Sequence, residues 1–132
     1  RSVGCELIFK TENLQKIGAF KARGACNALF SFKNATLQRG VITHSSGNHG
    51  AALVWAAQLR QTACCVVMPR NAPEVKKHAV ASYDAEIVFC EPSKSSREAT
   101  VAALMAARGS DHAAARQIFW QARGDCLERR QH

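Results

Sequence analysis

The sequence is poor in features that would assign a protein to the membrane, secreted or metal-binding classes. No apolar run in its 132 residues is long enough to span a bilayer. The six cysteines form no C-x-x-C pair, and Cys64 and Cys65 lie in an apolar run, so we expect reduced, buried thiols rather than zinc ligands or disulfides. The N-terminus, Arg1–Cys5, has neither a signal-peptide pattern nor an initiator methionine. We therefore expect a cytoplasmic protein whose sequence begins inside a longer gene.

The basic residues are scattered rather than clustered. The net charge of +8 indicates an anionic partner, either a small molecule or a nucleic acid. No run of lysine and arginine with interleaved aromatic residues is present, so we expect no nucleic-acid partner. The sequence has no internal repeats, and its length suits one domain with a workable core.

Apolar, β-prone runs alternate with helix-forming segments along the chain. The predicted strands are 7–9, 41–43, 63–68 and 87–90, and the predicted helices are 20–32, 51–57, 73–82 and 98–108. The run 63–68 has no polar alternation, which is typical of a central parallel strand buried on both faces. This alternation predicts a three-layer α/β fold with a parallel sheet of three or four strands between Val41 and Cys90.

The stretch Thr43–Gly50, with the sequence THSSGNHG, joins a predicted strand to an alanine-rich helix. A strand that turns through small residues into a helix directs several free backbone N–H groups, reinforced by the helix dipole, at one spot. Ser45, Ser46 and Asn48 add hydroxyl and amide groups that can bind a carboxylate. Ligands of such sheets bind at the carboxyl ends of the strands, where this loop is expected. By itself the spacing is equally typical of an ordinary capped helix.

A second motif lies upstream, where residues 9–25 read FKTENLQKIGAFKARGA. This segment resembles the lysine segment of the fold-type II pyridoxal-phosphate enzymes, the family of serine racemases and serine/threonine dehydratases. In that family the segment reads close to FKxENLQKxGAFKxRGA and the loop reads SSGNHG, in the same order and spacing. The resemblance runs from about Leu7 to Glu98 and is closest to eukaryotic serine racemases. It implies pyridoxal 5'-phosphate as cofactor, L-serine or L-threonine as substrate, and a homodimer.

By this resemblance, Lys21 is the lysine that forms a Schiff base with the cofactor and then takes or returns the substrate α-proton on one face. A lysine at a helix start is ordinarily a solvated surface charge, but the flanking 18–20 and 23–24 segments favour the catalytic interpretation. Ser46 is similar to the serine on the opposite face of the ring in racemases. Racemisation requires acid/base groups on both faces, whereas elimination of water requires one.

The resemblance also implies binding roles. Phe20 lies beside the cofactor ring in the family, a position that is compatible with simple core packing, and Asn48 bonds the phenolic oxygen of the ring. The loop that receives the substrate α-carboxylate is lined by Ser45, Ser46, Asn48 and His49. A hydroxyl is a poor base at its ordinary pKa, so Ser46 would need activation by a neighbouring group. His49 is one candidate for this role, and contact with the substrate carboxylate is its other possible role.

Lys16 and Tyr83 match positions that contact a nucleotide effector between subunits in similar racemases. The family also uses Mg²⁺ and ATP, but the acidic ligands of the cation are missing from this sequence, so we expect no metal site. The eight glycines are never contiguous, so the glycine-rich cup that holds the cofactor phosphate in the family is missing as well.

Three further positions have structural interpretations. His44 is expected to be a polar side chain at a strand end, and His78 to face solvent on a helix. Asp84 stands where the family usually has glycine. If that backbone is left-handed, aspartate tolerates it better than most residues, at a cost of about 1 kcal/mol.

The resemblance divides the chain into a lysine segment of the large, cofactor-binding domain (1–35), a small α/β domain (36–108) and an Ala- and Arg-rich tail that departs from the family (109–132). A frameshifted or alternatively spliced end is our interpretation of the tail, with an authentic new C-terminus as the alternative. The family members are more than twice as long, so we expect a truncated fragment with an incomplete large domain. The implied function is a pyridoxal-phosphate-dependent serine racemase or L-serine/L-threonine ammonia-lyase. The alternative is an inactive fragment that associates with a full-length subunit.

Overall fold

Among the residues that the computed structural model describes (4, 6, 8–108 and 116–117), four parallel strands form one sheet. The order across the sheet is β3–β2–β1–β4, and the bounds are β1 Val41–His44, β2 Cys64–Pro69, β3 Glu86–Cys90 and β4 Arg116–Gln117. The parallel sheet is confirmed, with three strands in the expected interval. The fourth strand comes from the segment that the sequence analysis assigned to a divergent tail, and its two residues pair with Val41 and Ile42. The proposed domain boundaries stay predictions.

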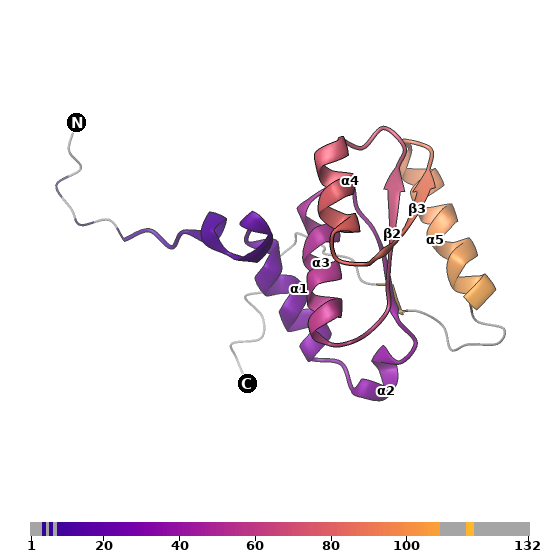
Figure 1. The fold of residues 1–132 in the computed structure, drawn as a ribbon, viewed down its shortest axis with the longest axis horizontal. Helices are drawn as coiled ribbons and strands as arrows, with labels where there is room; N and C mark the ends of the chain where they lie inside the picture. The colour runs from indigo at the N-terminus through magenta and orange to yellow at the C-terminus, as the bar shows by residue number, and fades with distance from the viewer. Residues whose placement is uncertain (1–3, 5, 7, 109–115, 118–132) are drawn as a thin grey trace.

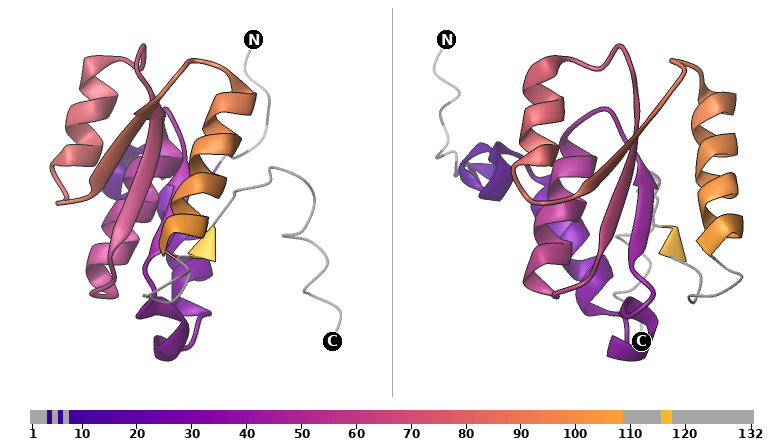
Figure 2. Two further views of the ribbon diagram at one scale, coloured as in Figure 1. Left: turned by 90° about the vertical axis from the view of Figure 1, so that its right-hand side faces the viewer. Right: turned by 45° about the vertical axis from the view of Figure 1, so that its right-hand side comes forward.

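Helices cover both faces of this sheet. The elements are η1 Glu12–Leu14, η2 Lys16–Gly18, α1 Lys21–Phe30, α2 Asn34–Leu37, α3 Asn48–Leu59, α4 Glu74–Ala81 and α5 Lys94–Arg108. Helices α1, α3 and α4 lie on one side of the sheet and α5 lies on the other (Figures 1 and 2). The three-layer α/β fold is therefore confirmed.

The two central strands supply both halves of the hydrophobic core, because successive side chains of a strand point to opposite faces. In β2, Cys64, Val66 and Met68 pack on the face covered by α3 and α4, whereas Cys65 and Val67 pack on the face covered by α5. Every residue of β2 is buried, as predicted for a central strand. On α5, Val101 is buried and is joined by Leu104 and Met105, so the predicted apolar face of that helix is also confirmed.

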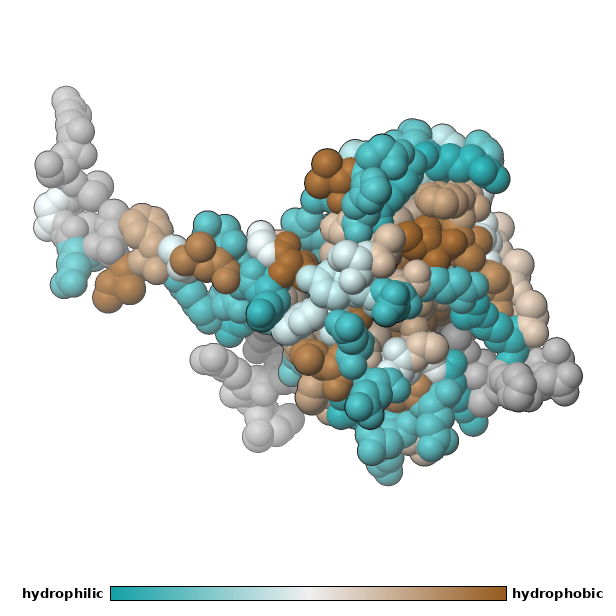
Figure 3. Space-filling view, viewed as in Figure 1, coloured by the Kyte–Doolittle hydropathy of each residue, from teal (hydrophilic) through white to brown (hydrophobic). Residues whose placement is uncertain are grey.

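The predicted strand 7–9 is wrong at Ile8 and Phe9, and Leu7 lies outside the described residues. Ile8 and Phe9 belong to no strand, and their side chains are 91% and 78% exposed. The segment that carries them extends away from the sheet (Figure 1), and its apolar side chains reach the surface (Figure 3), so it has no edge to pair with. The segment between the predicted helix 20–32 and the predicted strand 41–43 contains the short helix α2, where Arg60 donates a 2.7 Å hydrogen bond to the Asn34 side chain and Thr62 bonds the Leu37 carbonyl.

The cysteines that the structure describes form no disulfide; Cys64, Cys65 and Cys90 are buried and Cys26 is half-buried. Burial raises the pKa of Cys64 to about 12 and that of Cys65 to about 11. These thiols therefore stay protonated and unreactive at neutral pH. Among the described residues, no helix has the length and apolarity needed to cross a membrane.

Asp84 has a positive φ of 54°, as the sequence analysis anticipated. We predict that Asp84→Gly raises the free energy of unfolding by about 1 kcal/mol, because glycine adopts this conformation without a Cβ clash. The measurement is the urea midpoint at constant m-value. Ala79→Gly, inside α4, is the control and should lower stability by about 1 kcal/mol. Equal losses in both variants would contradict the prediction.

Candidate functional site

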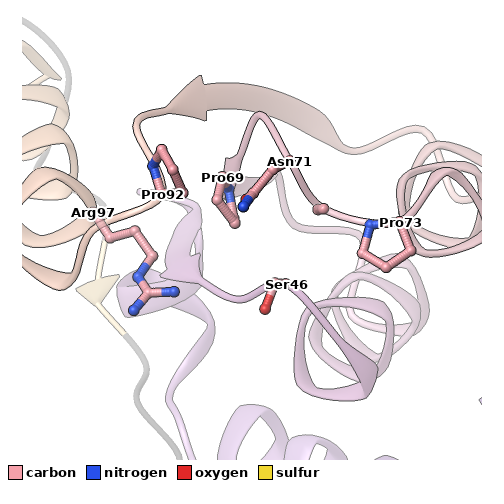
Figure 4. A pocket seen from close by; sticks show the side chains of 7 residues that line it. Ser46, Pro69, Asn71, Pro73, Pro92 and Arg97 are labelled. Carbon is pink, nitrogen blue, oxygen red and sulfur yellow. The ribbon is translucent and has the colours of Figure 1, made fainter.

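A cavity of about 250 Å³ opens at the carboxyl edge of the sheet, where the loops after β1, β2 and β3 meet. Figure 4 shows Ser46, from the loop after β1, between Arg97 on the α5 side and Pro73 on the α4 side. The cavity is lined by Ser46, Pro69, Asn71, Ala72, Pro73, Pro92 and Arg97. The predicted location of the loop that carries Ser46, at the carboxyl edge of the sheet, is therefore confirmed.

The loop between β1 and α3 is held by its own first serine. The Ser45 Oγ accepts hydrogen bonds from the backbone N–H groups of Gly47 at 3.2 Å and Gly50 at 3.0 Å. The Ser45 backbone N–H donates to the Val67 carbonyl of β2 at 3.1 Å. Two of the N–H groups expected to face a ligand are thus used inside the loop, which fixes its shape before any ligand binds.

Gly50 lies where the loop packs most closely against the sheet. A Cβ built there would lie 3.3 Å from Ser45 Cβ and 3.3 Å from Val66 Cγ1. Val66 is fully buried in β2, so it or Ser45 would have to shift by a few tenths of an ångström inside a packed core. A Cβ on Gly47 would meet nothing within 4 Å. Only the second glycine of the motif is therefore required by packing.

Lys21 is the first residue of α1, as predicted, and its side chain is half-buried. Its Nζ lies 4.6 Å from the centroid of the Phe20 ring, which is itself 52% exposed. Burial lowers the pKa of Lys21. A lowered pKa increases the fraction of neutral amine, which is the form that attacks a carbonyl carbon.

The remaining predicted residues lie outside the lining of the cavity. Asn48 begins α3 and accepts a 2.6 Å hydrogen bond from Lys76 Nζ of α4, and His49 follows it, half-buried. Lys16 is exposed in η2, whereas Tyr83 packs against the core beside α3. Of the predicted site residues, Ser46 alone lines the cavity, and the roles assigned to the others stay predictions.

Arg97 was missed by the sequence analysis. It enters the cavity from the first turn of α5, and its buried Nε has no hydrogen-bond partner among the described residues. The rule that located the Ser45–Gly50 loop, that ligands bind where parallel strands end, applies equally to the segment after β3 and would have found it. Burial lowers the pKa of His44 at the end of β1, and the positive charge of Arg97 lowers it further, so that imidazole is neutral at pH 7. His78 is exposed, as expected.

A parallel sheet whose loops build a polar cavity at its carboxyl edge defines an α/β ligand-binding protein. The sequence profile of the family described as "Pyridoxal-phosphate dependent enzyme" matches residues 1–120, and the chain belongs to that family. This match extends past Glu98, where the sequence analysis placed the end of the resemblance. In the part of the chain that the structure describes, no group of three or more His, Cys, Asp or Glu side chains is arranged to hold a metal ion.

The relatives are racemases and dehydratases. The chain is 54% identical over 108 residues to the β-hydroxyaspartate dehydratase of Paracoccus denitrificans, covering 82% of this chain and 34% of that protein. It is 50% identical over 102 residues to the serine racemase of Dictyostelium discoideum, covering 77% and 32%. The crystal structure of that racemase superposes with a TM-score of 0.73 at 44% identity, over 82% of this chain and 34% of the other. The chain thus spans about a third of the length of these relatives.

We predict that Gly50→Ala lowers the free energy of unfolding by about 1–3 kcal/mol, because the new methyl group must displace Ser45 or Val66. Chemical denaturation followed by circular dichroism measures the loss. Gly47→Ala is the matched control in the same loop and should cost under about 1 kcal/mol. If the two alanines prove equally costly, close packing at residue 50 is not what the loop requires.

Proposed function

We propose that this chain supplies the cofactor-binding lysine and the substrate loop of a pyridoxal-phosphate-dependent amino-acid racemase or ammonia-lyase that acts on L-serine or L-threonine. The observation that carries the proposal is Lys21, a half-buried amine of lowered pKa at the first turn of α1. Helix α1 packs against α3, whose N-terminus carries the Ser45–Gly50 loop, so one helix pair joins the two motifs.

The residues present fit part of the cofactor. Lys21 offers an amine to its aldehyde, and the Asn48 side chain offers an amide N–H to its phenolic oxygen, since Lys76 occupies the amide oxygen. The cofactor phosphate has fewer hydrogen-bond donors, because the sequence contains no contiguous glycines that could form a cup of backbone N–H groups. Cofactor binding by the 132-residue chain alone should therefore be weak.

Pyridoxal phosphate, when bound, withdraws electrons from the amino acid and so acidifies its α-hydrogen. Lys21 Nζ moves that proton on one face, and the Ser46 hydroxyl serves the opposite face during racemisation. The loop, with Ser45, Asn48 and His49, orients the substrate carboxylate. Elimination of water requires acid/base groups on one face only, to take the α-proton and to protonate the departing β-hydroxyl, so one site would support both reactions. The nucleotide contacts of Lys16 and Tyr83 belong to this proposal as a prediction only.

We predict that residues 8–108, placed in the matching segment of the Dictyostelium serine racemase, give an enzyme that forms pyruvate from L-serine and interconverts the serine enantiomers. Lys21→Ala should abolish both activities, together with the borohydride-reducible cofactor adduct at this position. Lys33→Ala, an exposed lysine that follows α1, is the matched control and should retain them. Turnover that survives Lys21→Ala would refute the proposal.

The 132-residue chain by itself should show no measurable turnover, which corresponds to the alternative of an inactive fragment that associates with another subunit. Hydrogen bonds to a charged group contribute roughly 1.5–3 kcal/mol each, so the loss of three phosphate contacts costs about 5–9 kcal/mol, or four to six decades of affinity. Pyruvate formation from L-serine with saturating cofactor measures this. Lys21-dependent turnover near that of a full-length relative would show that the phosphate is held by other groups.

A second substrate, β-hydroxyaspartate, is favoured by Arg97. This guanidinium lines the cavity beside Ser46 and retains donors for a second carboxylate, and the Paracoccus relative is a β-hydroxyaspartate dehydratase. In the same chimaera, Arg97→Met should lower kcat/KM for β-hydroxyaspartate about 10- to 100-fold and that for L-serine much less. Arg70→Met is the control, because Arg70 pairs with Glu91 at 3.6 Å on the surface of the same edge. Equal losses for both substrates would exclude this role.

A further inference from the structure

The side-chain amide of Asn48 has an oxygen that accepts hydrogen bonds and a nitrogen that donates them, and the structure shows a partner for the oxygen. Its Oδ1 accepts a hydrogen bond of 2.6 Å from Lys76 Nζ, across the contact between α3 and α4. A lysine ammonium has three donors and no acceptor, so it can pair only with the amide oxygen. The Nδ2 group, which carries two donors, is consequently the end that remains for a ligand.

We propose that Lys76 is a positioning residue that fixes the rotation of the Asn48 amide and so makes Asn48 a donor toward the ligand. This inference rests on the proposed function, because it concerns how the same loop receives an anionic oxygen. A phenolate or a carboxylate oxygen would be accepted at this position. A ligand group that must itself donate a hydrogen bond would be rejected.

The surroundings of Lys76 separate this role from an ordinary surface charge. Its neighbour Lys77 is engaged elsewhere, in a 2.8 Å bond to Glu74 and in a contact 5.5 Å above the ring of Phe89. Lys76 instead reaches to the first residue of α3, where the helix dipole is positive. A cation is unfavourable at that end of a helix, so this placement does not serve helix stability.

A charge-assisted bond of this kind also holds the amide more firmly than a neutral partner would. Without it the amide could turn by half a rotation, and the carbonyl oxygen would then face the ligand oxygen and repel it. The substitution Lys76→Arg keeps a charged group that can only donate, whereas Lys76→Met keeps neither the charge nor a donor. Lys76→Arg should therefore preserve the rotation of the Asn48 amide, and Lys76→Met should lose it.

The experiment uses the full 132-residue chain, labelled with ¹⁵N-asparagine, and follows the side-chain NH₂ signals of Asn48, which are assigned by their loss in Asn48→Ser. Lys76→Met should shift these signals and broaden them, Lys76→Arg should preserve them largely, and Lys77→Met, the matched control on the same helix, should leave them unchanged. Asn48 signals that are identical in the wild type and Lys76→Met would overturn the proposal.

The second arm titrates L-serine as the probe, because its net charge is zero near neutral pH and direct attraction to Lys76 is small. The apparent Kd, read from the Asn48 NH₂ signals, should rise about tenfold in Lys76→Met, the factor expected for loss of one hydrogen bond to a charged group, and change little in Lys76→Arg. An unchanged Kd in Lys76→Met would overturn the ligand-facing role. Failure of the proposed function is a separate result, since it appears as an inactive chimaera regardless of these signals.

Discussion

Burial of β2 on both faces is the constraint on which the rest of this structure depends. Its six residues are apolar without interruption, so neither face can be left to solvent, and helices must cover both. The period of two along the strand then divides the core, with Val66 facing α3 and α4, and Val67 facing α5. This arrangement fixes the carboxyl ends of three parallel strands at one edge, where the cavity lies.

The loop after β1 is built on that foundation. The Ser45 backbone N–H donates to the Val67 carbonyl of β2, and the Ser45 hydroxyl oxygen accepts hydrogen bonds from the backbone N–H groups of two glycines. Gly50 lets the start of α3 approach Val66 to a distance that a larger residue could not reach. The motif SSGNHG therefore encodes a rigid loop first, and a set of ligand contacts second. Such prior rigidity reduces the ordering cost of binding, because the loop does not have to be fixed by the ligand.

Charged groups approach this edge from two further helices. Arg97 arrives on α5 and Lys76 on α4, from opposite sides of the sheet. Each supplies donors without acceptors, so the region around Ser46 favours anionic oxygens over donor groups. The sequence analysis detected the net positive charge but could not locate it, because the basic residues are dispersed along the chain and Arg97 and Lys76 come to this edge only after the helices pack.

The sequence by itself determined the strand–helix alternation, the parallel central strand, the Lys21 motif and the family, since each depends on local periodicity or on residues close together in the chain. The sequence-based prediction of a strand failed at Ile8 and Phe9, because apolar, β-prone residues form a strand only where the edge of a sheet lies beside them. Only the tertiary structure decided that Arg116–Gln117 pair with β1 and that Ser45 uses two loop N–H groups. It alone decided, too, that Lys76 reaches Asn48. The pairing of Arg116–Gln117 and the bond from Lys76 to Asn48 join residues from separate elements, and contacts of that kind depend on how elements pack, which no local pattern records.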